Sequence, residues 1–526
     1  MNEFKLREAK DIAEHGSDEE VNRHLQRMTR VDRRVVSRKE TIGYMFFDGS
    51  SGFNIDSQRE LFVDSILQID LKKQSQFNIF AGIWDIVDDI VIGGIIEKTR
   101  TRWGKFVPYF FLVGIPYAIV VGLYWMLPLF FSEEHVNDLN YIPKFIAFIV
   151  LELLMETVKN FRGVATAGYL STITPYPSDR RRLLSVTKYF NLFYAGLPNT
   201  IVEFLLDFIT NGLIKASPTR TTADMMKWAL VILGPFTAVV TGLVTIWYST
   251  LAKERVHQSI ETPRIIDSLR VVFTNKPLLM YMISNSLGSF STGITTNNYY
   301  RWILFMTTFE TFAGIPSVFF QPLGYAKYNK LAAKYSTKRL YMLGYSIPKA
   351  SYIPVFLYGL LIRDKDGNQL FKNRIAMFPV TALWEIVYAS FQGIIGISRD
   401  EIQNECNDYI EWKTGHRNEA ILQVASTIMC KIPVRVNAIF TPLIKDWIGY
   451  DQNAYKNVQP QPERAQPWIF AMSTLFPAIL AILSIVPMFG YKIDKATRDN
   501  MYAELNARRS ETAQKITDAE SGISED

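Results

Sequence analysis

The chain has 526 residues, of which 48% are hydrophobic and 21% are charged, and its formal net charge is +6. Its two cysteines, Cys406 and Cys430, exclude a disulfide scaffold. The moderate positive charge is better explained by basic loops on one side of a membrane than by nucleic-acid binding. A membrane span needs about 20 apolar residues, and the chain has room for about twelve such spans.

The N-terminal part of the chain predicts a cytoplasmic tail followed by six spans. Residues 1–40 mix acidic and basic side chains and lack the apolar core of a signal peptide. The first span is the least apolar, with Asp56, Glu60 and Asp64, so its polar side chains must face a water-filled cavity or the bundle interior. The spans of this half, within residues 41–251, are expected at about 42–69, 76–97, 107–131, 142–170, 183–213 and 225–251.

A basic central loop at residues 252–277 divides the chain near its middle and is expected in the cytoplasm. Six further spans follow within residues 278–491, and a polar cytoplasmic tail occupies residues 492–526. We therefore expect an all-α membrane protein of twelve transmembrane helices in two six-helix halves. It should be multi-pass in a plasma or bacterial inner membrane, with both termini in the cytoplasm. The later spans are expected at about 278–305, 309–327, 340–362, 375–398, 419–447 and 468–490.

The second span combines an apolar sequence with acidic residues, in the stretch WDIVDDIVIGGIIEKTRTRWGKFVP from Trp84 to Pro108. Asp85 and Asp89 are four residues apart and therefore share one face of a helix. A carboxylate in hydrocarbon costs roughly 3 kcal/mol, so each needs a cation, a polar partner or water. Two carboxylates on one face predict a site for Na⁺ or for a shared proton.

Two motifs far apart in the chain carry a family resemblance. The first is WDxxxD at Trp84–Asp89 followed by TRTRWGKFxPY, and the second is DYxEWKTGxRNE beginning at Asp408. Together they resemble the glycoside–pentoside–hexuronide:cation symporters, a branch of the major facilitator fold. The resemblance covers spans 1–5 and 10–11. It implies cation-coupled uptake of a sugar or glycoside, hexuronides included, by alternating access of the two halves.

The resemblance implies that Asp85 and Asp89 bind the coupling cation, which is a metal, Na⁺, if the protein is sodium-coupled. Asn160 matches a position that often helps to ligate the cation, and Asp88 replaces a common asparagine, which leaves Na⁺ and H⁺ both open. Without a cation the unpaired carboxylates repel each other. Cation binding neutralises them, lets Lys431 reorganise and raises substrate affinity through a reciprocal coupling of roughly 1–3 kcal/mol. The alternative is a structural Asp–Lys network that only holds the helices together.

The resemblance also implies substrate-contacting positions, which are Asp48, Lys188, Thr427 and Lys431. The acid with which the family grips the sugar falls on Gly163 here, whereas the neighbouring Arg162 adds a basic group. Guanidinium groups bind planar anions bidentately, which favours an acidic solute such as a uronide. The competing interpretation is that the bases pair with acids of their own helix, which makes a neutral glycoside the default solute. These pairs are Glu156–Lys159 and Asp56–Arg59.

The loop between the second and third spans is basic and is therefore expected on the cytoplasmic side. We expect it to close the inward-facing side of the protein by pairing with acidic residues of the second motif. The expected gating residues are Arg100, Arg102, Lys105, Asp408 and Glu411. The alternative is a solvated loop whose charges have no partner of their own.

No motif of an enzyme or of an ATP-driven pump competes with transport, because HExxH, GxSxG and GxxxxGK[ST] are absent from the sequence. We expect no cofactor apart from the coupling cation, Na⁺ or H⁺. The expected partners are a small-molecule solute, the cation and the lipid bilayer, with no nucleic acid, and the protein is expected to act as a monomer. Two alternatives are a lysolipid or other amphiphile carrier of the same fold and a non-transporting membrane sensor or scaffold.

Overall fold

A computed structural model describes residues 35–99, 101–174, 177–217, 220–255, 275–414, 419–493, 497–498 and 500–505. Within these residues the regular structure is helical and no strand is formed, so the predicted all-α class is confirmed. Arg100 lies outside the described residues, as do most of the two predicted tails and the predicted central loop. The side chain of Thr427 is likewise not described.

The first predicted span is not one helix. The helix α3 (Arg38–Gly49) ends at a glycine, and regular structure resumes only with single turns that lead into a π-helical segment at Phe62–Ile66. A Cβ atom added at Gly49 would lie 2.4 Å from the side chain of Asn191, so the segment packs closely on its neighbour. The other helices of this half are α5 (Leu71–Lys98), α6 (Val107–Met126), α7 (Glu133–Asn137), α8 (Ile142–Thr172), α9 (Pro177–Tyr194), α10 (Leu197–Thr210) and α11 (Thr222–Leu251).

The C-terminal half also contains interrupted spans, because the predicted spans at 278–305 and 340–362 each form two consecutive helices. The tenth span was predicted to end at 398, but α19 continues to Thr414, because its polar residues form helix beyond the apolar segment that hydropathy detects. The helices are α13 (Lys276–Ser289), α14 (Thr296–Trp302), α15 (Phe309–Gly314), α16 (Ser317–Lys334), α17 (Thr337–Ala350), α18 (Tyr352–Leu361), α19 (Arg374–Thr414), α20 (Glu419–Ile448), α21 (Ala465–Ser473) and α22 (Leu475–Ile485).

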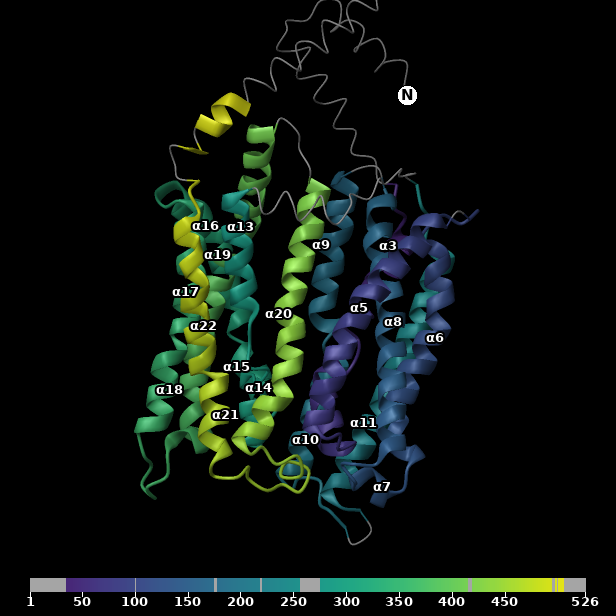
Figure 1. Cartoon of the computed structure of the whole chain (residues 1–526), viewed down its shortest axis with the longest axis vertical. Coiled ribbons are helices and arrows are strands. Elements are labelled where there is room, and N and C mark those ends of the chain that lie inside the picture. The colour runs from purple at the N-terminus through teal and green to yellow at the C-terminus, as the bar shows by residue number, and fades with distance from the viewer. Residues whose placement is uncertain are drawn as a thin grey trace, which may run out of the picture.

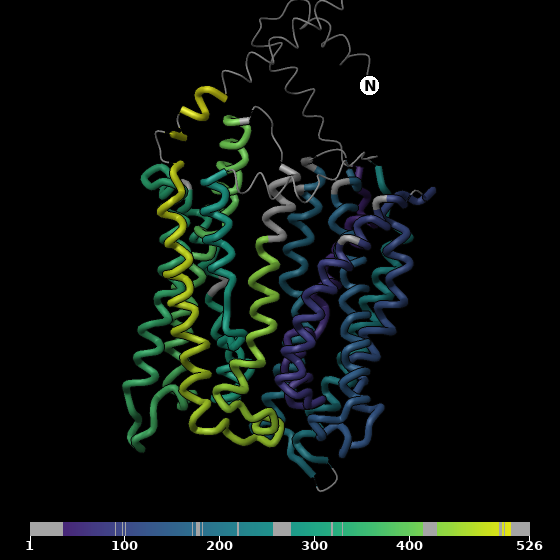
Figure 2. The backbone as a smooth tube through the Cα atoms, viewed as in Figure 1, coloured from purple at the N-terminus to yellow at the C-terminus, as the bar shows by residue number. Residues whose placement is uncertain are grey.

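The two halves lie side by side, with the N-terminal helices in purple to blue-teal and the C-terminal helices in teal to yellow (Figure 1). The helices α5 and α20 meet between the halves, and their contact is among the more extensive ones in the molecule. We call the end of the bundle with loops 131–141, 211–221, 362–373 and 449–464 the distal end. The opposite end, which carries the described residues nearest to both chain ends, is the terminal end, at the top of Figure 2.

The outer surface of the bundle is apolar. On α6, for example, Phe111 and Leu112 are 56% and 61% exposed. A soluble protein rarely exposes apolar patches of this extent, whereas lipid tails accept them. Five helical segments are long and apolar enough to cross a membrane among the described residues, so the count of twelve spans stays a prediction.

Small residues allow close helix packing inside the N-terminal half. The helices α6 and α11 approach each other where Gly242 faces Gly114, since a Cβ atom at Gly242 would lie 2.5 Å from the Gly114 carbonyl oxygen. Membrane helices use such small residues because lipid gives them no hydrophobic drive to associate. The closely packed helices α6 and α11 therefore lie behind the polar groups of the first span.

Candidate functional site

A cluster of charged side chains joins α5 of the N-terminal half to α20 of the C-terminal half. The Lys431 ammonium lies 3.3 Å from an Asp85 oxygen and also contacts the Asp89 carboxylate. The Arg435 guanidinium lies 2.9 Å from the same Asp85 oxygen, and its other nitrogen is 3.6 Å from Glu156 on α8. Two carboxylates of α5 therefore share two cations of α20, and they lie on one face of the helix, as their four-residue spacing predicted.

The third carboxylate of α5 turns toward α8. Asp88 accepts hydrogen bonds from Thr157, at 3.1 Å, and from the Asn160 amide, at 2.9 Å, and the same amide is 3.4 Å from Asp85. Asp85 and Asp88 are only 6% and 7% exposed. Asn160 thus bridges the two buried carboxylates, and the four predicted cation-site residues lie in one cluster.

The expectation that the acidic pair is unpaired is wrong for this conformation. Lys431 and Arg435 already neutralise Asp85 and Asp89, so the pair does not simply repel itself. Among the described residues, no group of three or more His, Cys, Asp or Glu side chains is arranged to hold a metal ion. In this conformation a cation at Asp85 or Asp89 would compete with Lys431 and Arg435.

A cavity of about 380 Å³, the N-half cavity, lies beside this cluster and contains two of the predicted substrate residues, Asp48 and Arg162. Asn191 donates a 2.7 Å hydrogen bond to Asp48, and the exposed Lys188 ammonium is 3.9 Å from that carboxylate. Lys431 points instead into the charged cluster. The cavity lining is Phe47, Asp48, Ser51, Asp56, Tyr117, Lys159, Arg162, Gly163, Thr166 and Ala167.

The basic residues near the N-half cavity have partners, but not those that the sequence suggested. Lys159 pairs with Asp56 at 2.5 Å, whereas Glu156 binds Arg435. The remaining cation of the first span, Arg59, contacts Glu152 of α8. The expected pairs within one span, Glu156–Lys159 and Asp56–Arg59, are therefore wrong, because these residues form ion pairs between the first span, α8 and α20 instead.

Arg162 is buried and held by neutral oxygens rather than by a carboxylate. Its guanidinium donates to the Phe47 carbonyl at 2.7 Å and to the Ser50 hydroxyl at 2.6 Å, and it lies over the Phe47 ring. These contacts fasten α8 to the end of α3. Through these hydrogen bonds Arg162 has a structural role in the wall of the N-half cavity.

The polar residues of the first span form a contact between the halves toward the distal end. The ammonium of Lys445, which is 2% exposed, lies 2.5 Å from both Glu60 and Asp64. Arg301 of α14 donates a 2.5 Å hydrogen bond to Gln58. Polar groups in a membrane need such internal partners, and the predicted inward orientation of this span is confirmed.

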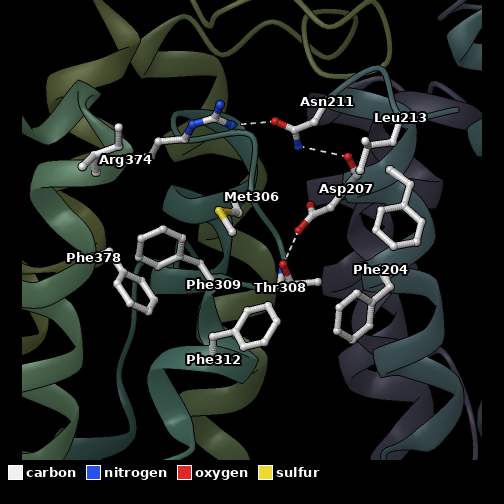
Figure 3. Close-up of a pocket in the computed structure, with 12 residues that line it drawn as sticks. Phe204, Asp207, Asn211, Leu213, Met306, Thr308, Phe309, Phe312, Arg374 and Phe378 are labelled. Atoms are coloured by element: carbon white, nitrogen blue, oxygen red, sulfur yellow. Dashed lines mark hydrogen bonds between the residues drawn. The ribbon is translucent and has the colours of Figure 1, made fainter. Parts of the chain in front are cut away.

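A second distal contact joins α10 to the start of α15. The Asp207 carboxylate accepts backbone hydrogen bonds from Thr307 and Thr308, at 2.6 and 2.8 Å, and from both hydroxyl groups. Figure 3 shows its contact with Thr308. Asn211 extends the contact by donating to the Phe305 carbonyl at 3.0 Å. Beside it lies a cavity of about 620 Å³ lined by Phe204, Phe208, Phe309, Phe312 and Phe378. The rings of Phe204 and Phe312 pack edge to face, as do those of Phe309 and Phe378 (Figure 3).

At the terminal end, three of the predicted gating residues, Arg102, Lys105 and Asp408, each have a contact within their own half. Glu254 accepts the backbone N–H groups of Lys105, Phe106 and Val107, and Arg102 stacks on Trp103. In the other half, Tyr502 donates a 3.1 Å hydrogen bond to Asp408.

Burial and the Asp408 charge raise the pKa of the Tyr502 phenol, which therefore stays protonated as a donor. The predicted pairing of the basic loop with Asp408 or Glu411 stays a prediction for another conformation.

Sequence reasoning missed Arg435 and Lys445. Arg435 lies one turn after Lys431, so the sequence already placed both cations on one face of the eleventh span. Lys445 is a charged residue within an apolar helix, and such a residue is a functional candidate by default. Counting basic residues along α20 would have found both.

Comparisons with known proteins agree with this geometry. A sequence profile described as "MFS/sugar transport protein" matches residues 41–495. The chain is 22% identical to the isoprimeverose transporter of Lactiplantibacillus pentosus, covering 82% of this chain and 83% of that protein. It is 20% identical to the glucuronide carrier protein homolog of Escherichia coli (strain K12), covering 83% of this chain and 88% of that protein.

Among solved structures, the inward open conformation of the xylose transporter XylE from E. coli matches with a TM-score of 0.52 at 11% identity. The match covers 88% of this chain and 98% of that one, which shows a shared major facilitator fold.

Proposed function

Because the chain belongs to the MFS/sugar transport protein family, of the glycoside–pentoside–hexuronide type, we propose that it is a secondary active transporter of a sugar or glycoside coupled to Na⁺ or H⁺. It is an integral membrane protein, and the proposed activity is transport rather than catalysis. We further propose that it works as a monomer with the distal end outside and both termini in the cytoplasm.

The charged cluster between α5 and α20 is the observation that carries the coupling proposal. Each half contributes one sign of charge, the acids from α5 and the bases from α20. A proton or Na⁺ that binds Asp85 or Asp89 competes with Lys431 and Arg435, and it therefore loosens a bond between the halves. The coupling cation would in this way lower the barrier to movement while releasing Lys431 toward the solute.

Alternating access is supported by where the halves hold together. The described contacts between the halves are numerous toward the distal end, at Lys445, Asp207 and Arg301. At the terminal end, Glu254 and Asp408 bind partners in their own halves. We infer that this conformation is closed at the distal end, and that outward opening must break the distal contacts in exchange for contacts at the terminal end.

Uptake into proteoliposomes tests the proposal. Protein reconstituted with an inward Na⁺ or proton gradient should accumulate labelled sugar above its external concentration, and an ionophore that collapses the gradient should abolish accumulation. A sensor or scaffold would accumulate none of the sugars offered. A passive carrier would equilibrate the sugar without concentrating it, so either result contradicts coupled transport.

A further inference from the structure

A second polar cavity lies wholly within the C-terminal half. It measures about 400 Å³, which falls in the range of small-molecule sites, and we call it the C-half cavity. Two basic residues line it, Lys349 of α17 and Arg399 of α19, together with hydroxyl and amide groups. The polar lining is Asn285, Ser289, Tyr345, Lys349, Tyr388, Gln392, Arg399 and Cys430.

Neither basic residue of this cavity is neutralised within the described part of the chain. Lys349 donates a 2.9 Å hydrogen bond to the Tyr345 hydroxyl, which in turn donates to the Gly288 carbonyl at 2.6 Å. No ion pair of Lys349 or Arg399 with a described acid is formed. Lys349 is half-buried and Arg399 is exposed, and basic residues within the membrane part of a protein often mark substrate or ion pathways.

Two acids of α19 near Arg399, Glu401 and Glu405, are already engaged elsewhere, and Glu385, one turn before Tyr388, is not among the lining residues. Glu401 accepts a 2.5 Å hydrogen bond from Tyr328, and Glu405 accepts hydrogen bonds from Thr337 and Tyr491 at 2.8 and 2.9 Å. The contrast with the N-half cavity is direct, because Lys159 there pairs with Asp56. In the N-half cavity the two lining acids, Asp48 and Asp56, balance the two lining bases, Lys159 and Arg162, whereas no acid is among the lining residues of the C-half cavity.

The C-half cavity is also adjacent to the charged cluster. Cys430 lines the cavity, and the next residue of α20, Lys431, binds Asp85 and Asp89. Consecutive residues of a helix point about 100° apart, so α20 presents Cys430 to the cavity and Lys431 to the cluster. A ligand in the cavity would thus contact α20, the helix whose Lys431 and Arg435 bind Asp85 and Asp89.

We propose that the C-half cavity receives an acidic group of the transported solute, a carboxylate or a sulfonate, with Lys349 and Arg399 as its cationic partners. This inference rests on the proposed sugar transport and narrows the solute to an acidic sugar. Tyr388 and Gln392 provide hydrogen-bonding groups for the sugar hydroxyls on the same wall. The arginine supplies a planar, bidentate donor, and the lysine supplies a point charge.

The native Cys430 reports the charge of the cavity directly. In purified protein with Cys406→Ala, the labelling rates of Cys430 by an anionic and a cationic methanethiosulfonate (sulfonatoethyl and trimethylammonioethyl) are compared with those of 2-mercaptoethanol. The ratio of the two rates cancels any change in thiol reactivity. For Cys430, we expect the ratio of the anionic to the cationic labelling rate to exceed the same ratio for 2-mercaptoethanol by on the order of tenfold or more.

Substitutions assign this preference to the two bases. Lys349→Gln and Arg399→Gln should each lower the ratio, and Lys349→Arg should keep it. A matched control is Gly163→Cys in a Cys430→Ser background, because that position lines the N-half cavity and has room for a side chain. Its ratio should be close to that of the reference thiol. The proposal is overturned if Cys430 shows the same rate ratio as 2-mercaptoethanol. It is also overturned if both glutamine variants leave the ratio at Cys430 unchanged.

A solute pair completes the test. Methyl β-D-glucuronide should slow alkylation of Cys430 by N-ethylmaleimide, methyl β-D-glucoside should slow it far less, and Lys349→Gln should remove the difference. Equal protection by both sugars, or protection by neither, overturns the proposal even if the protein accumulates sugar. Failure of the transport proposal is distinguishable, because gradient-driven uptake would be missing while the labelling preference and the uronide protection persist.

Discussion

The Arg435 guanidinium lies 2.9 Å from the Asp85 carboxylate and links a helix of one half to a helix of the other. The carboxylate is nearly fully buried, so this contact is more than a surface ion pair. It changes how the acidic pair is understood, because the pair is held by cations of the opposite half before any coupling ion arrives.

The first prediction concerns the strength of this link. Arg435→Gln leaves a buried carboxylate without one of its partners, so it should lower the melting temperature of the purified protein. Asp85→Asn removes the charge that Arg435 neutralises, and the double variant should therefore be more stable than the sum of single effects predicts. The expected interaction energy is about 0.5–3 kcal/mol in a double-mutant cycle. Additive effects would show that the two side chains do not interact.

The second prediction concerns the distal contacts. Asp207→Ala removes one acceptor that several hydrogen bonds share. Because their contributions are not additive, we take the value of one charge-assisted hydrogen bond, about 1.5–3 kcal/mol, which should favour the outward-open state by about ten- to a hundredfold. Spin labels at Leu129 and Leu361, exposed residues of the two halves at the distal end, should then report longer distances. The control is Asp224→Ala, because Asp224 binds Thr221 and Lys227 within its own half. An unchanged distance distribution in Asp207→Ala would contradict the assigned gate.

The third prediction concerns topology. In a cysteine-free background, a cysteine at Arg102 should react with a membrane-impermeant reagent only after the cells are opened, because the basic loop is expected inside. A cysteine at Leu213, which is 72% exposed at the distal end, should react in intact cells. Labelling of position 102 from outside would reverse the topology and remove the proposed inward gate.

The fourth prediction concerns ion choice. Asp88 accepts hydrogen bonds from Thr157 and Asn160, which both lie on α8, and it lies away from the cations of α20. Asp88→Asn should therefore keep gradient-driven uptake but change the relative effectiveness of Na⁺ and H⁺. Uptake measured under each gradient alone tests this. Loss of uptake under both gradients would place Asp88 in the coupling pair itself.

The sequence predicted the fold class and the acidic cluster because both depend on local patterns. Apolar runs mark the spans, and Asp85 and Asp89 share a face by their spacing alone. The sequence also coupled Lys431 to this pair through the resemblance, but the contacts of Arg435 with Asp85 and Glu156 could not be predicted, since they form only when α5, α8 and α20 are packed. The first span shows the same limit: its polarity predicted inward-facing groups, but not that Glu60 and Asp64 would share Lys445.

The predicted substrate charge shows why a list of bases is insufficient. Lys159 and Arg162 suggested that the solute is anionic. In the N-half cavity, however, Lys159 binds Asp56, and Arg162 binds backbone and hydroxyl oxygens. Lys349 and Arg399 drew no attention in the sequence, because no motif surrounds them. Whether a base is neutralised depends on which acids the fold brings near, and that is a property of packing.

The most direct test of the account is uptake by Asp85→Asn and Asp89→Asn in proteoliposomes with an inward Na⁺ or proton gradient. Both substitutions keep the side-chain size but remove the charge that binds the coupling cation and the α20 bases. We expect each variant to insert and fold, and to lose the gradient-dependent accumulation of labelled sugar seen with the unsubstituted protein. Accumulation at the unsubstituted rate in both variants would contradict the assignment of Asp85 and Asp89 as the coupling site.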